Sequence, residues 1–220
     1  MRTLFRLAVL AALLLLPTYA QAAGGKCVAL TFDDGPSATL TPRLLDILED
    51  EHAVATFFVV GQNVRAHPEI VRRAYEAGNE IGNHSWSHPN FFKLSSESVA
   101  SQISKTDAAI KAAIGIMPRL VRPPYGNHNA RIDKAIGTRP IILWDIDTLD
   151  WKYRNVAHVT NAAEEAVSGQ NILMHDIHAS TVASVRGIID DFKKRGYGFV
   201  TVSELLAGKC SSKITVANLD

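Results

Sequence analysis

Two adjacent carboxylates and two closely spaced histidines are the residues of this chain best suited to hydrolytic chemistry. Asp33 and Asp34 lie in the segment ALTFDDGPS, and His84 and His88 lie in NHSWSHP. Two histidines and one carboxylate form a known zinc ligand set that leaves one position open for water. A metal can lower the pKa of its water to about 7, which permits hydrolysis at neutral pH. Asp34 can complete such a set, and Asp33 is then free to act as a base.

Simpler interpretations exist for both pairs. Asp, Gly and Pro all favour turns, so the first segment can be only a turn. A spacing of four puts two histidines on one face of a helix, where they can bind a metal or simply face solvent. Pro89 disfavours a helical conformation at His88, which makes a tight loop equally plausible. A thermolysin-type peptidase needs Glu after the first histidine, and Ser85 occupies that position, which argues against a peptidase.

Strands and helices that alternate after residue 26 must position these groups. The chain of 220 residues is most simply one domain. Strands are predicted at residues 28–32, 55–60, 80–83, 119–121, 140–146, 171–174 and 199–202. Helices are predicted at residues 41–52, with Thr41 as N-cap, and at 68–78, 95–114, 129–136, 158–167 and 181–195. This alternation predicts a parallel α/β fold, either an open doubly wound sheet or a closed barrel.

Polar residues follow successive predicted strands at their carboxyl ends. They are Asp33, Asp34, His84, His88, Arg122, Asp147, Asp150, Trp151, His175 and Asp176. Turn chemistry alone would not place acids, histidines and an arginine at the same end of successive strands. In open sheets and in barrels, functional groups gather at this end, so we expect these side chains to share one rim.

Five segments resemble the motifs of the polysaccharide deacetylase family, which is also called the NodB homology domain or carbohydrate esterase family four. TFDDGPS, HSWSHP, RPPYG, DTLDW and LMHD occur in the family's order and approximate spacing between residues 31 and 176. The resemblance implies a distorted, incomplete (β/α) barrel of about seven parallel strands. It also implies a single catalytic domain over residues 23–220 and metal-dependent removal of acetyl groups from sugars.

The resemblance implies a metal site and a base. Asp34, His84 and His88 are the implied ligands of a divalent metal, with zinc expected first and cobalt or nickel as alternatives. Asp33 is the implied general base, and Arg122 is implied to hold it in place.

The resemblance also implies an acid, an oxyanion contact and a pocket. His175 is the implied general acid, which Asp150 orients and charges. The backbone N–H of Tyr125 is implied to stabilise the oxyanion. Trp151 and Leu173 are the implied lining of a pocket for the acetyl methyl group.

Two further histidines near the predicted rim are open candidates. His128, in GNHN, can contact sugar, and His178, three residues beyond His175, is the rival general acid.

The two ends of the chain point to export. Residues 1–22 combine Arg2 and Arg6 with an apolar run over residues 7–16 and an AQA ending, which is typical of a secretory signal peptide cleaved after Ala22. The alternative is an uncleaved anchor, but the run is shorter than the roughly 20 residues that span a bilayer. We therefore expect a periplasmic or secreted protein without a membrane span after cleavage.

The cysteine count and the overall charge limit structure and partners. The only cysteines are Cys27 and Cys210, and in an oxidising compartment such a pair suggests a disulfide, with two free thiols as the alternative. The formal net charge is +1 and no basic stripe is present, which argues against a nucleic acid partner. We expect a monomer whose partner is its polysaccharide substrate.

The sequence therefore predicts an exported metal-dependent hydrolase that removes N-acetyl groups from a glycan containing N-acetylglucosamine, either peptidoglycan or a chitin-type chain. One alternative is an O-acetyl esterase acting on xylan or an exopolysaccharide, because the same site can attack esters. Another is a sugar-binding protein with a decayed site, against which the five complete motifs argue.

Overall fold

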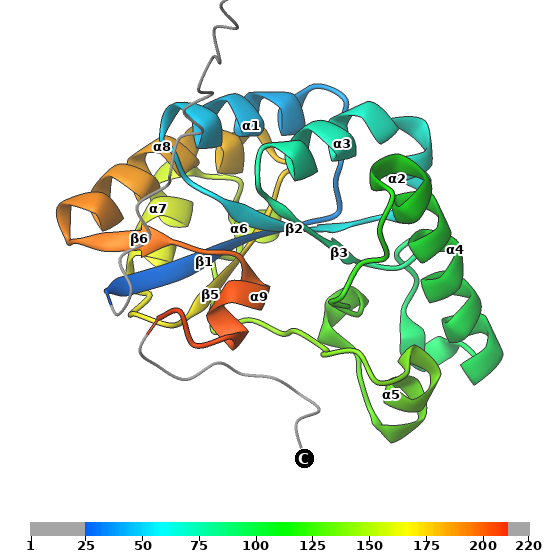
Figure 1. Cartoon of the computed structure of the whole chain (residues 1–220). Coiled ribbons are helices and arrows are strands. Elements are labelled where there is room, and N and C mark those ends of the chain that lie inside the picture. The colour runs from blue at the N-terminus through cyan, green and yellow to red at the C-terminus, as the bar shows by residue number, and fades with distance from the viewer. Residues whose placement is uncertain (1–24, 211–220) are drawn as a thin grey trace, which may run out of the picture.

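The fold is built on one parallel sheet, as the computed structural model of the chain shows for residues 25–210 (Figure 1). The predicted signal peptide lies outside the described residues. The strands are β1 (Lys26–Asp33), β2 (Ala55–Val59), β3 (Glu80–Asn83), β4 (Ile146–Asp147), β5 (Asn171–His175) and β6 (Tyr197–Phe199). Their order is β3-β2-β1-β5-β4, with β6 paired to the first residues of β1, and every pairing is parallel.

Two isolated bridges carry the sheet past β3 and nearly close it. Val121 pairs with Asn83 on one side and with Ile141 on the other, both in parallel. The chain then runs from Ile141 to β4, which pairs with β5 at the opposite edge of the sheet. The result is the predicted distorted, incomplete barrel.

The predictions of continuous strands at 119–121 and 140–146 are wrong. Val121 and Ile141 form isolated bridges, Ile142 is a further bridge residue, and only the short β4 is a strand in these segments. The physical reason is the side chain of Arg122, whose guanidinium donates hydrogen bonds to the carbonyls of Ile142 and Leu143 at 3.2 and 2.9 Å. These carbonyls therefore bond to a side chain inside the barrel and not to a neighbouring strand.

Helices surround the sheet in Figure 1. They are α1 (Leu40–Asp50), α2 (Gly61–Ala66), α3 (Pro68–Glu76), α4 (Ser96–Ile114), α5 (Ala130–Ile136), α6 (Asp150–Tyr153), α7 (Val156–Glu164), α8 (Ala179–Lys194) and α9 (Val202–Leu206). Two 3₁₀ turns, η1 (Phe91–Lys93) and η2 (Pro124–Gly126), precede α4 and α5. No helix within residues 25–210 is long and apolar enough to cross a membrane.

Two predicted boundaries are corrected by side-chain hydrogen bonds. Thr41 is not an N-cap, because α1 begins one residue earlier and the Thr41 hydroxyl donates to the buried carboxyl of Asp176. The predicted strand at 199–202 ends at Phe199. Thr201 instead caps α9 and forms a reciprocal capping box with Glu204.

Alternation along β1 separates a helix-facing core from the barrel interior. Val28, Leu30 and Phe32 belong to the large buried cluster beneath the helices. Thr31 and Asp33 bond to the Arg122 guanidinium on the other face. Because successive strand side chains point to opposite faces, this register places Asp33 inside the barrel at the carboxyl end of β1.

A smaller apolar cluster packs α9 against β1 and β2. It contains Phe58, Val202 and Leu205 of α9, Cys27 and Cys210. The two cysteines form the predicted disulfide, which links residues 183 positions apart with a Cα–Cα distance of 5.7 Å. The bridge therefore links the segment that follows α9 to the first strand.

We expect the Cys27→Ala/Cys210→Ala double variant to fold but to lose stability. Chain entropy allows a loop of this length to contribute up to about 5 kcal/mol to the free energy of unfolding. Urea denaturation of the oxidised wild type, the reduced wild type and the double variant measures the difference. Reduced wild type is the matched control and should unfold like the variant. Equal midpoints for all three samples would show that the bridge does not stabilise the fold.

Candidate active site

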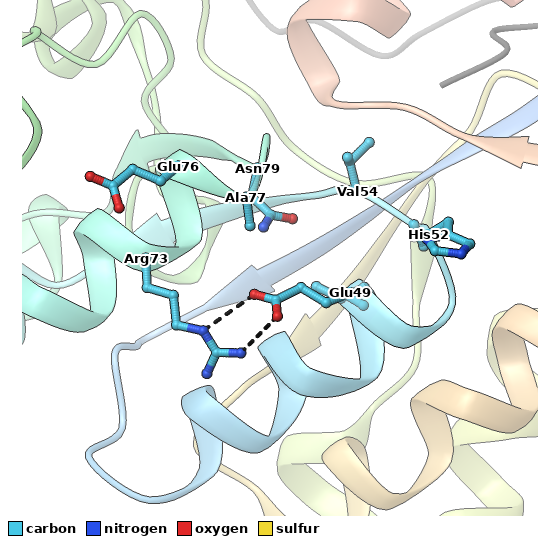
Figure 2. A pocket seen from close by; sticks show the side chains of 9 residues that line it. Glu49, His52, Val54, Arg73, Glu76, Ala77 and Asn79 are labelled. Atoms are coloured by element: carbon cyan, nitrogen blue, oxygen red, sulfur yellow. Dashed lines mark hydrogen bonds and ion pairs between the residues drawn. The ribbon is translucent and has the colours of Figure 1, made fainter. Parts of the chain in front are cut away.

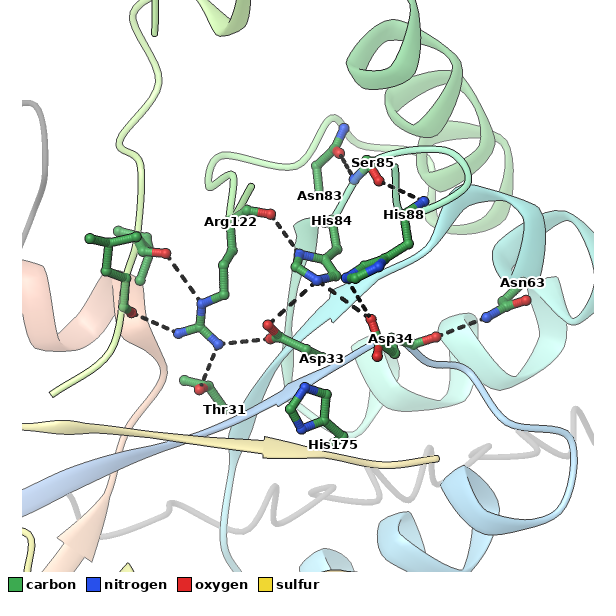
Figure 3. A network of polar contacts seen from close by, with 12 residues as sticks. Thr31, Asp33, Asp34, Asn63, Asn83, His84, Ser85, His88, Arg122 and His175 are labelled. Carbon is green, nitrogen blue, oxygen red and sulfur yellow. Dashed lines mark hydrogen bonds and ion pairs between the residues drawn. The ribbon is translucent and has the colours of Figure 1, made fainter. Parts of the chain in front are cut away.

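A cavity of about 340 Å³ opens at the carboxyl ends of the strands. The side chains that line it are Asp33, Asp34, His84, His88, Tyr125, Trp144, Asp147, Trp151, Leu173 and His175. Every predicted metal-binding, catalytic and pocket residue thus lines this cavity except Arg122 and Asp150, which lie behind it. Figure 3 shows the two carboxylates, the histidines and Arg122 converging on one centre.

Both adjacent carboxylates reach this centre because the backbone changes conformation between them. Strand geometry would turn neighbouring side chains to opposite faces. Asp33 is the last strand residue, whereas Asp34 has a φ of 75°, in the left-handed region. That turn directs both carboxylates to the same side, and the Asn63 amide donates to the Asp34 carbonyl at 2.8 Å.

Gly35 is required at the next position by a buried acid. A Cβ atom on Gly35 would lie 2.2 Å from a carboxylate oxygen of Asp176. Burial raises the pKa of Asp176 to about 7, although the hydrogen bond from Thr41 opposes the rise. The turn at Asp34 and Gly35 therefore packs directly on the carboxyl group of Asp176, the residue after His175.

Asp34, His84 and His88 form a donor set that fits a divalent cation. One ligand atom from each lies within 4.8 Å of the others. Asp34 Oδ1 is 3.5 Å from His84 Nε2 and 3.3 Å from His88 Nε2, and it is a buried oxygen without a hydrogen bond among residues 25–210. Two imidazoles and one carboxylate match the open zinc sites of hydrolases.

The protonation of His84 suits a metal ligand. Its Nδ1 lies 2.6 Å from the carbonyl oxygen of Arg122, so Nδ1–H donates and the Nε2 lone pair faces Asp34. Burial lowers the pKa of His84 to about 3, against the charge of Asp34, which raises it. The imidazole is therefore neutral.

The two histidines lie on a tight loop and not on a helix, which resolves the two structures considered for them. Ser85 and His88 have φ values of 76° and 55°. The Ser85 hydroxyl accepts the N–H of His88 at 3.0 Å. The Gln102 side chain accepts the N–H groups of Trp86 and Ser87 at 2.9 and 3.0 Å, so α4 holds the loop from outside.

Arg122 is fully buried and its donors are all engaged. Besides the two carbonyls of the broken strand, it donates to Thr31 at 2.9 Å, to Asp33 at 2.7 Å and to Asn171 at 3.0 Å. Burial raises the pKa of Asp33, and the positive charge of Arg122 opposes that rise. Only Asp33 Oδ1 is held by Arg122, so Oδ2 remains directed toward His84, 3.6 Å away.

His175 and Asp150 form a hydrogen-bonded pair on the opposite side of the cavity. His175 Nδ1 lies 2.7 Å from Asp150 Oδ1, while Asp150 Oδ2 accepts the His175 N–H and the Thr181 hydroxyl. Burial by itself would lower the pKa of His175, but the hydrogen bond and charge of Asp150 outweigh it and raise the pKa to about 9. Burial would likewise raise the pKa of Asp150, but the bonds from His175 and Thr181 lower it.

The two remaining candidate histidines have other partners. His178 is 8% exposed and its Nδ1 contacts the guanidinium of Arg154. Burial and Arg154 together lower the pKa of His178. His128 Nδ1 lies 3.5 Å from a carboxylate oxygen of Asp133, and His128 is not among the side chains that line the cavity.

Two cavity residues were not assigned a role from the sequence. Trp144 falls inside the segment predicted as a continuous strand, and no motif includes it. A Cβ atom on Gly126 would lie 3.0 Å from its ring, so the RPPYG turn rests on this indole. Asp147 lies on the predicted rim without a predicted role, and its carboxylate accepts the backbone N–H of Leu149 at 2.8 Å.

Tyr125 completes the rim. It has a φ of 61° and is 63% exposed, and its ring meets the ring of His88 edge-on with centroids 4.7 Å apart.

Comparison with known proteins identifies the family of the chain. Residues 20–140 match the profile of the family described as polysaccharide deacetylase. The chain belongs to the polysaccharide deacetylase family. The resemblance inferred from the five motifs is therefore confirmed.

Named relatives of this family include a cell-wall enzyme. The chain is 45% identical over 194 residues to the peptidoglycan-N-acetylglucosamine deacetylase PgdA of Listeria monocytogenes. The match covers 88% of this chain and 41% of the Listeria protein, so the chain spans about two fifths of that relative.

Solved deacetylase structures share the fold. The T48 deacetylase, solved with substrate, superposes with a TM-score of 0.81 at 44% identity and covers 88% of this chain and 95% of that one. A family 4 acetyl xylan esterase from Clostridium thermocellum, solved with a cobalt ion, gives a TM-score of 0.78 at 35% identity and covers 83% and 91%.

Proposed function

We propose that this polysaccharide deacetylase removes N-acetyl groups from a glycan containing N-acetylglucosamine, with peptidoglycan as the first candidate. The observation that carries the proposal is the single cavity on which three groups converge. They are the Asp34, His84 and His88 set, the Asp33–Arg122 pair and the His175–Asp150 pair. The similarity to the Listeria peptidoglycan deacetylase supports the choice of substrate.

Asp34, His84 and His88 would hold the metal, for which zinc is the proposed identity. When bound, a divalent cation supplies Lewis acidity that polarises a carbonyl and makes water a stronger nucleophile at neutral pH. The neutral imidazole of His84 and the buried oxygen of Asp34 are suited to this ligation. The cobalt ion in the Clostridium thermocellum esterase supports a cation in this family.

Asp33 is the proposed general base. Arg122 binds one carboxylate oxygen and fixes the group, so the other oxygen, Oδ2, can take the proton from the attacking water. The rise in the pKa of Asp33 on burial makes that oxygen a stronger base than an exposed carboxylate would be.

His175 is the proposed general acid. Because its Nδ1 is engaged by Asp150, the proton it delivers is the one on Nε2. An amide nitrogen leaves only after protonation, so a histidine kept charged near neutral pH suits an N-acetyl substrate. His178, whose pKa is lowered beside Arg154, is less suited to this role.

The remaining rim residues bind and orient in this proposal. The backbone N–H of Tyr125 donates to the oxygen that gains negative charge. Trp151 and Leu173 contact the acetyl methyl group, and Trp144 adds a further apolar wall to the same cavity.

The O-acetyl esterase alternative is favoured by one comparison, the acetyl xylan esterase of Clostridium thermocellum. The proposed base and acid, each paired with a charged partner around the cavity, argue against a protein that only binds sugar. Export of the chain is supported by the disulfide, which is typical of oxidising compartments.

Acetate release from peptidoglycan, chitooligosaccharides and acetylated xylan tests the proposal. We expect release from the N-acetylated substrates, loss of release after chelation, and recovery with zinc or cobalt. Release from xylan alone would establish the esterase alternative. Binding without turnover of any substrate would establish the sugar-binding alternative, and full activity after exhaustive chelation would exclude the metal role of Asp34.

A further inference from the structure

A groove of about 670 Å³ lies on the outer wall of the barrel between α2, α3 and α4. We call it the basic groove, and it is lined by Val64, Arg65, Pro68, Arg72, Trp86, Lys105, Ala108, Ala109, Ala112 and Ala113. Four of the lining residues are alanines of α4, and Arg65, Arg72 and Lys105 are the charged ones. None of the residues that line this groove has a predicted catalytic, metal-binding or substrate-binding role.

The charge of the basic groove is of one sign. Its lining contains Arg65, Arg72 and Lys105 and no acidic side chain. The pocket between α1 and α3 differs from the basic groove, because its arginine is paired with an acid (Figure 2). There Arg73 donates to both carboxylate oxygens of Glu49, at 3.2 and 3.1 Å, and its charge is neutralised locally. Within residues 25–210, none of the three cations of the basic groove makes a comparable ion pair, which leaves the groove suited to an anion.

Two of the three cations are held in place. The Arg65 guanidinium lies over the Trp86 ring, 5.0 Å from its centroid. Arg72 donates its Nε–H to the carbonyl of Ala113 at 3.0 Å, which leaves its two terminal amino groups for a ligand. A planar guanidinium that is already oriented loses less side-chain entropy on binding a carboxylate than a free one does.

Trp86 connects the basic groove to the candidate active site. It lies in the loop between His84 and His88, where Gln62 N–H donates to the Trp86 carbonyl at 3.0 Å. Its ring also rests on α2, because a Cβ atom on Gly61 would lie 2.5 Å from it. Trp86 therefore belongs both to the loop that carries the two histidines and to the lining of the groove.

We propose that the basic groove binds the carboxylates of the peptide substituents on a peptidoglycan strand whose acetylated sugar occupies the cavity. This inference rests on the proposed function and deepens it. Chitin-type chains carry no carboxylates, so the groove raises activity on peptide-bearing glycan relative to neutral glycan of the same length. Charge complementarity selects this occupant over an uncharged chain.

The test compares two substrates and two matched double variants. Arg65→Glu/Lys105→Glu reverses two groove charges, and Arg119→Glu/Lys194→Glu reverses two exposed charges elsewhere. We expect the ratio of kcat/KM on peptide-bearing peptidoglycan fragments to kcat/KM on chitooligosaccharides to fall by about 10-fold in the groove variant. The control variant should keep the wild-type ratio. Lys105→Glu alone, which leaves Trp86 untouched, should lower the ratio in the same direction.

Binding supplies a second readout that does not depend on turnover. Co-sedimentation with insoluble peptidoglycan in the presence of a chelator should weaken in the groove variant, and wild-type binding should weaken as salt rises. An unchanged ratio in a folded groove variant overturns the proposal. A loss of binding confined to walls that carry teichoic acid phosphates also overturns it. If the wild type fails on every N-acetylated substrate, the proposed function itself fails, which is a separate result.

Discussion

Asp33→Asn is expected to lower kcat by roughly 10²–10⁴-fold while the protein keeps its bound metal. The asparagine carbonyl oxygen can still accept the hydrogen bond that Arg122 donates to Oδ1. The amide nitrogen that replaces Oδ2 is a hydrogen-bond donor whose lone pair is delocalised into the carbonyl, so it cannot take a proton. The loss should therefore fall on proton transfer and leave the proposed ligand set of Asp34, His84 and His88 intact.

Asp34→Asn is the matched control, because it makes the same chemical change one residue away. It replaces a charged ligand with a neutral one, so metal affinity itself should fall. Activity of Asp34→Asn should recover in part at high zinc, whereas activity of Asp33→Asn should not. A zinc titration with bound metal and acetate release measured together separates the two variants. Thermal unfolding of both checks that Arg122, left beside a neutral residue in Asp33→Asn, does not unfold the barrel.

The opposite pattern would reverse the roles of the two carboxylates. Asp33→Asn would then lose the metal and Asp34→Asn would keep it. Full activity and full metal content in both variants would mean that the segment is only a turn.

The motifs predicted which residues meet, but not how adjacent residues can do so. Asp33 and Asp34 were assigned separate roles from residue type and resemblance. A positive φ at Asp34 directs both to one side, and the next residue, Gly35, lies against the Asp176 carboxyl. That contact joins residues far apart in the sequence, and local propensity carries no signal for it.

The errors in the strand predictions have a similar origin. Residues 140–146 are apolar enough to favour a strand, and the prediction treated their carbonyls as partners for a neighbouring strand. In the folded chain Arg122 donates hydrogen bonds to two of those carbonyls, and the segment forms only bridges at Ile141 and Ile142 before β4. A side chain 20 residues away thus decides the local backbone conformation.

The basic groove and the role of Gln102 lay beyond sequence reasoning for the same physical reason. Helix α4 was predicted almost to its ends, since Ser95 and Gly115 are strong capping residues. Which of its faces meets the loop after β3 depends on how the helix is rotated against the barrel. That rotation brings Gln102 to the N–H of Trp86 and places Lys105 in the same groove as Arg65.

Asp150→Asn is expected to move the alkaline limb of the pH profile to lower pH. His175 must be protonated to act as the acid, so activity is present below its pKa and is lost as pH rises through it. Asp150 is the main group that raises this pKa to about 9, whereas burial acts in the opposite direction. Without the charge of Asp150, the pKa of His175 should fall to about 6.5 or below.

The size of the effect follows from that shift. At pH 8 a histidine with a pKa of about 6.5 is protonated in only about one molecule in 30, whereas one with a pKa of about 9 is mostly protonated. The kcat/KM of Asp150→Asn at pH 8 should therefore fall by roughly 30-fold relative to wild type. The deficit should shrink as the pH is lowered toward 6.

Thr181→Val provides the control, because it removes one hydrogen bond to Asp150 and leaves its charge in place. Its alkaline limb should move much less than that of Asp150→Asn. The measurement is kcat/KM between pH 5.5 and 10 for wild type and both variants on a chitooligosaccharide. If the limb of Asp150→Asn stays at the wild-type position, the titrating acid is not His175. His178, which contacts Arg154 and not Asp150, would then be the next group to replace.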